Sequence, residues 1–150
     1  MLKVIEKFIN DIKYFEENPY EDDDKRFPYR LPRAKDVLLA LELFSKLPSE
    51  INRPNTYIFD GIVSLDWKSN NWKEWDLGMP QIRKSLTVSF YTNYEYKRVL
   101  WWHKRIEKEP VIQIIYLTPQ ENHSKTVNTV DDVLEIILPL LNDIQFKPQK

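Results

Sequence analysis

Asp60, Asp66 and Lys68 have the residue types and the spacing of a metal-dependent nuclease or hydrolase site. In such enzymes carboxylates hold Mg²⁺ in a cleft, and a lysine two positions after an acidic residue faces the same side of its strand. Asp60 also precedes Gly61, however, and an Asp-Gly pair between two apolar runs predicts a two-residue hairpin turn. We therefore interpret these residues as turn and surface positions, and keep the metal-dependent hydrolase as an alternative.

Few other residues in the chain have types that catalysis uses. The only histidines are His103 and His123, and the absence of cysteine excludes thiolate nucleophiles and cysteine-ligated metals. His103 ends a predicted strand and His123 lies in a predicted polar loop, so both are interpreted as surface histidines. Two glycines in 150 residues also argue against a glycine-rich phosphate-binding loop. The sequence predicts no catalytic residue, no metal and no cofactor.

The segment 94–108 mixes basic and aromatic residues and is a candidate nucleic-acid interface. Basic side chains neutralise phosphates, and aromatic rings stack on bases. The net charge of −1, in contrast, supplies no overall field that would attract the chain to nucleic acid. Trp101 and Trp102 would also point to opposite faces of a strand, so we expect one of them in the core. The residues that this alternative would use are Lys97, Arg98, Trp102, Lys104 and Arg105.

Two predicted loops carry features of a protein-binding surface. Residues 68–83 form a long connection with large apolar side chains, which either supply contact area to a partner or fold back onto the sheet. Residues 21–24 are all acidic, and they either steer a basic partner or form a solvated loop. They lack the glycine and the interleaved ligands of a calcium loop. The predicted partner contacts are Trp72, Trp75, Met79, Tyr57, Phe59, Asp22, Asp23 and Asp24.

Apolar periodicity places helices at both ends of the chain. Residues 2–17 repeat apolar side chains every three or four positions and predict an amphipathic helix. Pro32 suits the first residue of a second helix over about 32–46, whose apolar residues surround most of its circumference. Such a helix is either buried on two sides or covered by a partner. Thr129, with Asp132 three residues on, predicts the N-cap of a C-terminal helix.

Alternating apolar residues and turn signals predict five strands between these helices. Asn93 is expected to form a turn, and residues 118–128 a polar loop. Short links between successive strands predict an antiparallel meander with helices on one face. The chain is thus expected to be a single α+β domain, residues 1–150, in the order α-α-β-β-β-β-β-α. The predicted strands are 56–59, 62–67, 84–92, 95–103 and 111–117, and the core side of the first two holds Ile58, Val63, Leu65 and Trp67.

The helix-to-hairpin unit contains a series of short motifs: Leu31-Pro32 through Ala40-Leu41, then Leu47-Pro48, Pro54 and Asp60-Gly61-Ile62-Val63-Ser64-Leu65-Asp66-Trp67. This series resembles a pattern in small uncharacterised bacterial and phage proteins, in which a helix ends in Leu-Pro and a later strand reads Asp-Gly-x-Ile-x-Leu-Glu-Trp. Asp66 stands where that pattern has Glu. The resemblance spans about 40 of the 150 residues. It implies a bacterial or phage accessory protein and brings no activity with it.

These features together predict a non-catalytic protein that binds another protein and acts by occluding its surface, as immunity proteins, antitoxins and phage counter-defence inhibitors do. No apolar run approaches the ~20 residues that cross a bilayer, so we expect no membrane partner and a cytoplasmic location. The identity of the partner and the oligomeric state stay open. The hydrolase and the nucleic-acid-binding module are the two alternatives.

Overall fold

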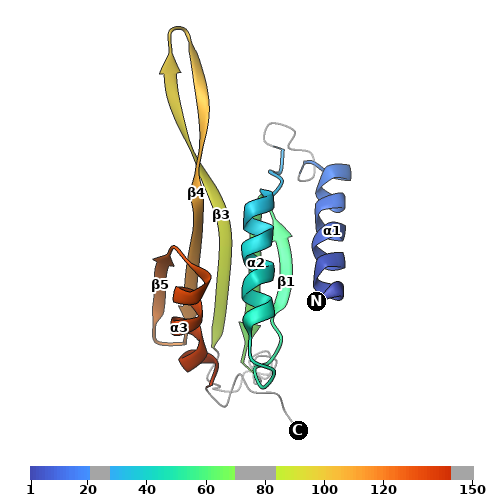
Figure 1. Ribbon diagram of the computed structural model, residues 1–150, viewed down its shortest axis with the longest axis vertical. Helices are drawn as coiled ribbons and strands as arrows, with labels where there is room; N and C mark the ends of the chain where they lie inside the picture. The colour runs from blue at the N-terminus through green and yellow to red at the C-terminus, as the bar shows by residue number, and fades with distance from the viewer. Residues whose placement is uncertain (21–27, 70–83, 143–150) are drawn as a thin grey trace.

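The computed structural model describes residues 1–20, 28–69 and 84–142. These residues form an antiparallel sheet whose strands follow one another in space as they do along the chain, β1-β2-β3-β4-β5. Two helices precede the sheet and one follows it (Figure 1), which confirms the predicted α+β meander. The elements are α1 (Leu2–Glu17), α2 (Ala34–Lys46), β1 (Asn55–Phe59), β2 (Ile62–Lys68), β3 (Ser85–Val99), β4 (Trp102–Leu117), β5 (Asn122–Val127) and α3 (Val130–Leu141).

The turn between β1 and β2 has the two-residue form that Asp60-Gly61 predicts. Both residues have positive φ angles, 47° at Asp60 and 79° at Gly61, as a type I′ hairpin turn requires. Phe59 therefore pairs directly with Ile62. A Cβ atom on Gly61 would lie 3.2 Å from the Cβ atom of Arg30, so both the backbone angle and the crowding favour glycine here.

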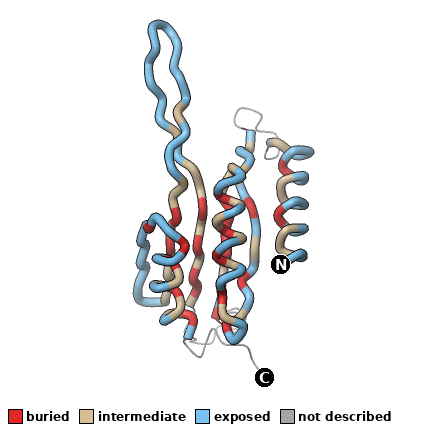
Figure 2. Tube along the Cα trace, viewed as in Figure 1, coloured by how far each residue is buried: buried red, intermediate tan, exposed pale blue. Residues whose placement is uncertain are grey.

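The core lies on the face of the sheet that α2 and α3 cover (Figures 1 and 2). Because paired residues share a face, the register aligns one buried row across the first four strands: Ile58, Val63, Phe90 and Ile112. Trp67 is buried on the same face and donates its indole N–H to the Asn52 carbonyl at 2.7 Å. The predicted core face of the first hairpin is therefore confirmed, with Ile58, Val63, Leu65 and Trp67 all buried.

Helix α1 covers the free edge of β1 instead of lying on the helical face. Asp11 accepts the outward-pointing backbone N–H of Ile58 at 3.0 Å, a group that would otherwise be unpaired at the edge of the sheet. Phe8 from the same helix reaches the core. The range of α1 agrees with the prediction, but its position differs from the prediction that all helices share one face.

Helix α2 begins later than predicted and is partly buried on two sides. Arg33 is its N-cap, so Pro32 lies before the helix and is not its first residue. Ala40 and Leu43 are fully buried, and α2 packs against β2 and β3 as well as against α1 and α3. Leu38 remains 64% exposed, which shows that neighbours within the chain cover only part of its apolar circumference.

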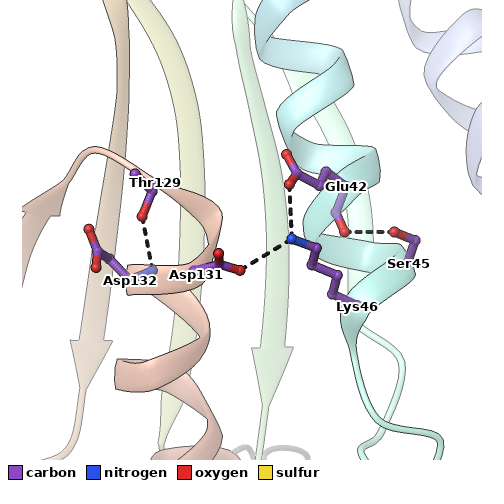
Figure 3. Close-up of polar contacts among 6 residues, drawn as sticks. All are labelled: Glu42, Ser45, Lys46, Thr129, Asp131 and Asp132. Carbon is purple, nitrogen blue, oxygen red and sulfur yellow. Dashed lines mark hydrogen bonds and ion pairs between the residues drawn. The ribbon is translucent and has the colours of Figure 1, made fainter.

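Helix α3 has the predicted N-cap and is tied to the end of α2 (Figure 3). The Thr129 hydroxyl accepts the backbone N–H of Asp132 at 3.1 Å, which satisfies one of the free amides of the first turn. Lys46 of α2 lies 3.2 Å from the Asp131 carboxylate of α3 and 3.1 Å from Glu42 of its own helix. These two carboxylates raise the pKa of Lys46 through their hydrogen bonds.

The second half of the sheet differs from its predicted division into strands. Asn93 does not turn the chain: β3 continues to Val99, with a register shift between Thr92 and Tyr94. The predicted strands 95–103 and 111–117 consequently belong to one long hairpin, and 111–117 is the inner part of β4. Within the predicted polar loop 118–128, residues Asn122–Val127 form the outer strand β5. No helix among residues 1–20, 28–69 and 84–142 is long and apolar enough to span a bilayer.

Candidate functional site

The outer part of the β3–β4 hairpin, residues 94–107, projects beyond the body of the sheet (Figure 1); we call it the arm. Its two strands pair from Tyr94 and Glu107 at the base to Val99 and Trp102 at the outer end. With about 3.4 Å per residue, the six paired positions extend roughly 17 Å. Residues 95–105 are all exposed (Figure 2), so no other element packs on either face of the arm.

The outer end of the arm is apolar and unusually exposed. Trp101 is 83% exposed, Leu100 69% and Trp102 47%, and the two indole rings pack edge to face with centroids 5.4 Å apart. We define Val99, Leu100, Trp101 and Trp102 as the tip. The prediction that either Trp101 or Trp102 is buried in the core is therefore wrong. Successive residues of a strand do point to opposite faces, but the arm extends beyond the body of the sheet, so no layer of the protein covers either face.

The turn at the tip is strained, in contrast to the β1–β2 turn. Leu100 has a φ of 55°, a left-handed conformation that glycine and asparagine adopt easily and a bulky aliphatic residue seldom does. Such conformations cost about 1–3 kcal/mol and persist where the surroundings or the function require them. The tip thus holds a large apolar side chain at a position where the fold alone would favour a small residue.

Four basic residues flank the tip on both strands: Lys97, Arg98, Lys104 and Arg105, which we call the collar. Lys97 lies directly opposite Lys104, and Arg98 lies opposite His103. Like charges directly opposite each other on neighbouring strands are destabilising. In the part of the chain that the structure describes, no collar residue forms an ion pair. Arg98 does donate a hydrogen bond to the Leu100 carbonyl at 3.3 Å, and Arg105 lies over the Tyr94 ring, but neither contact neutralises the charge, so all four cations can still attract an anionic partner.

The charge of the arm contrasts with that of the rest of the chain. The arm, residues 94–107, has a formal charge of +2, because Glu95 and Glu107 at its base offset two of the four collar cations; its outer part, residues 96–106, has no Asp or Glu and carries +4. Because the whole chain carries −1, the residues outside the arm carry −3. The small net charge therefore conceals a concentrated positive region at one end of the molecule.

The base of the arm is clamped to the start of α2. Two guanidinium groups lie close to the Tyr94 ring, with Arg33 Cζ 5.1 Å and Arg105 Cζ 4.5 Å from its centroid. Arg33 also donates a hydrogen bond to the Tyr94 hydroxyl and lies 3.6 Å from the Glu107 carboxylate. The hydrogen bond to Tyr94 is the main cause that raises the pKa of Arg33. These contacts fix the direction in which the arm leaves the body.

A second contact anchors the base at the register shift. The Thr92 hydroxyl donates to Asp36 Oδ2 at 2.8 Å, and Asp36 is fully buried. Its other oxygen, Oδ1, has no hydrogen-bond partner among the described residues. Burial raises the pKa of Asp36, and this effect outweighs the opposing hydrogen bond from Thr92. A cavity of about 560 Å³ lies beside these contacts and is lined by Arg30, Arg33, Tyr94, Arg105 and others.

The structure assembles the predicted nucleic-acid residues and separates the predicted metal residues. Lys97, Arg98, Trp102, Lys104 and Arg105 all lie on the arm. Asp60 instead accepts the Arg30 backbone N–H at 2.9 Å in its turn, and Asp66 accepts the Thr87 hydroxyl at 2.8 Å. Five residues separate Asp60 from Asp66 in the chain, and the extended run from Ile62 to Asp66 alone spans roughly 14 Å. Lys68 follows Asp66 at the end of β2, so the three groups do not converge.

The predicted protein-docking residues are only partly within the described residues. Trp72, Trp75, Met79, Asp22, Asp23 and Asp24 lie outside them. Tyr57 and Phe59 are exposed on the sheet face opposite the core, but Phe59 also packs against Phe15 and Tyr29, with ring centroids 5.7 and 5.3 Å away. His103 lies within the arm, and His123 lies 2.9 Å from Glu121 at the surface.

The predicted site residues did not include Tyr94, Arg33 or the strained Leu100. The sequence does contain one signal for the arm: Lys97-Arg98 and His103-Lys104-Arg105 bracket four apolar residues almost symmetrically. A basic-apolar-basic order within one hairpin predicts a charged, apolar-ended projection. Searches against protein-family models, curated proteins and solved structures found no match to the chain.

Proposed function

We propose that this protein is a non-catalytic binding protein that occupies the surface of a partner macromolecule, and that the arm is its principal contact element. The observation that carries this proposal is the exposed tip, Val99 to Trp102, at the end of a hairpin that projects from the body. Large contiguous apolar side chains at a protein surface mark interaction sites, whereas scattered ones do not. The tip joins four such residues in one place.

The composition of the arm supports a contact role. Tryptophan, tyrosine and arginine are the residues that contribute most often to binding hot spots. The arm holds Trp101 and Trp102 at the tip, Tyr96 and Arg98 behind them, and none of these side chains packs into the core. Burial of one such indole in a partner contributes about 1.5–3 kcal/mol, enough to offset the strain at Leu100.

The charges of the arm indicate the chemistry of the partner. Among the described residues the four collar cations have no carboxylate partner, so they favour an anionic surface and increase the rate of encounter with it. The predicted steering of a basic partner by Asp22 to Asp24 would act at a different part of the chain. The engagement of Asp60 and Asp66 in protein hydrogen bonds favours binding over the hydrolase alternative.

A photo-cross-linking amino acid placed at position 101 tests this proposal in an extract of the cells that make the protein. We expect covalent adducts from position 101 and none from position 38 of α2, where Leu38 is also largely exposed, at 64% against 83% for Trp101. The same cross-linking amino acid at position 38 controls for non-specific capture of proteins by any exposed apolar site. Equal adduct yields at the two positions, or adducts at position 38 alone, would contradict the role of the arm.

A further inference from the structure

We propose that the partner of the arm is double-stranded DNA, and that the arm enters a groove with its tip first. This inference rests on the proposed function and adds the class of the partner. It depends on how the charges and the apolar residues of the arm are distributed over its two faces and its end.

The collar places cations on both faces of the ribbon. Lys97 and Lys104 are paired and share one face, while Arg98 and His103 are paired and share the other, together with Arg105. A flat acidic surface on a protein, or a bilayer, would face only one side or the end of such a ribbon. A groove of DNA has two phosphate walls, so cations on both faces have a partner at the same time.

The apolar tip would lie where a groove exposes its bases. With the two faces of the ribbon turned towards the phosphate walls, Leu100 and Trp101 point at the floor of the groove. Apolar side chains at that position contact thymine methyl groups or wedge between base steps. The order of the residues along the arm, with cations behind an aromatic end, therefore matches the order of chemical groups from the rim of a groove to its floor.

The dimensions of the arm select B-form DNA. A two-stranded ribbon with its side chains is about 10 Å thick, and the major groove of B-form DNA, about 12 Å wide and 8.5 Å deep, admits one. The arm, roughly 17 Å long, reaches the floor while the body stays outside. The major groove of A-form RNA is too deep and narrow for side chains to read. Duplex RNA therefore does not offer the same fit.

The rest of the molecule limits the contact to the arm. The residues outside the arm carry a net −3 and would be repelled by phosphate, whereas the contact of Arg33 with Tyr94 anchors only the base of the arm to the start of α2. Arg33 is itself paired with Glu107, and Arg30 with Asp60 at 3.7 Å. Four phosphate contacts are consequently the expected number, which predicts modest affinity and a defined dependence on salt.

Fluorescence anisotropy with a labelled 20-base-pair duplex tests the charge part of this inference. Four phosphate contacts predict that affinity falls roughly 100-fold between 50 and 200 mM salt. The double variant Lys97→Gln/Lys104→Gln should reduce that dependence to roughly tenfold, because two contacts remain. The matched control Lys13→Gln/Lys125→Gln removes the same charge from exposed positions outside the arm. It should change neither the affinity for the duplex nor the dependence of that affinity on salt. Equal weakening by the control pair would overturn the inference.

The variant Trp101→Ala tests the tip, with Leu38→Ala as its control. Loss of the indole should weaken duplex binding at least tenfold while the salt dependence stays the same, and circular dichroism should show an intact fold in both variants. Binding only to single-stranded DNA, to RNA, to polyglutamate or to anionic vesicles would overturn the assignment of duplex DNA. In that case cross-linking from position 101 would still support the arm as a contact element. If the protein neither bound duplex DNA nor formed cross-links from position 101, the proposed function would be refuted as well.

Discussion

Lys97 and Lys104 face each other across the two strands of the arm, and neither has a carboxylate partner in the described residues. Because this arrangement opposes folding, Lys97→Glu should stabilise the arm by a few tenths of a kcal/mol through an opposite-charge pair with Lys104. Urea unfolding measures the change. Lys125→Glu on β5 makes the same change of charge outside the arm, and a gain of stability there of equal size would show that the Lys97–Lys104 pair is not responsible.

Leu100→Gly should relieve the strain of the tip turn. Glycine adopts the φ of 55° without steric cost, so the free energy of unfolding should rise by up to about 1 kcal/mol. Amide hydrogen exchange of residues in the arm should slow accordingly. Val99→Gly, one position earlier in the strand, should have the opposite effect, because glycine weakens an extended segment. Unchanged or faster exchange in Leu100→Gly would show that the turn is not strained.

Asp36 should make stability depend on pH. Its pKa in the folded protein is raised above the value of 3.8, so the folded state retains a proton that the unfolded state has lost. Stability should therefore decrease as pH rises from 3.8 through the folded pKa, by about 1.4 kcal/mol for each unit of the shift. Asp36→Asn should lack this component of the pH profile. Thr92→Val should widen the window, since the Thr92 hydrogen bond lowers the pKa of Asp36.

Gly61→Ala should destabilise the protein by about 1–2 kcal/mol. The φ of 79° is unfavourable for a residue with a Cβ atom, and that atom would crowd Arg30 at 3.2 Å. Thermal unfolding measures the change. Asp60→Asn should not show this loss from backbone strain, because asparagine tolerates the φ of 47° at position 60. A Gly61→Ala variant as stable as the parent would exclude the I′ turn.

Tyr94→Leu should loosen the direction of the arm without unfolding the body. The substitution removes the ring that contacts Arg33 and Arg105 but keeps an apolar side chain of moderate size. Distances between spin labels at positions 97 and 13 should show a broader distribution in the variant than in the parent. Tyr94→Phe retains the ring and loses only the hydroxyl, so its distribution should be intermediate. Identical distributions in all three proteins would mean that the clamp does not orient the arm.

The parts of the fold that follow from local chemistry were predictable from the sequence. The Asp60-Gly61 turn fixes its own backbone angles, and alternation then places Val63 and Leu65 on the buried face. Thr129 likewise caps α3 through a contact three residues away. In each case a short stretch contains all the residues that determine the outcome.

Long-range pairing determined the parts that were mispredicted. Asn93 suits a turn as well as an irregular strand, and only the pairing of Tyr94 with Glu107 decides for the strand. The outer strand β5 is polar except for Val127, so its sequence does not differ from that of a loop. Alternation placed one of Trp101 and Trp102 in the core, because it assumes that a layer covers the strand.

The candidate site was half predictable for the same reason. Basic and aromatic residues in 94–108 identified the collar, since composition is local. The clamp on Tyr94 involves Arg33, which is 61 residues away in the sequence, and no local pattern signals it. Recognition that the basic residues bracket an apolar centre would have predicted the tip as well.

The arm also has a mechanical consequence, because its strands are the same strands that run through the middle of the sheet. A pull on the tip acts along β3 and β4, perpendicular to the hydrogen bonds that join them to β2 and β5. Those bonds are therefore stressed together, in shear, and not opened one after another like a zipper. The molecule should withstand tension at this end far better than a hairpin attached by a loop would.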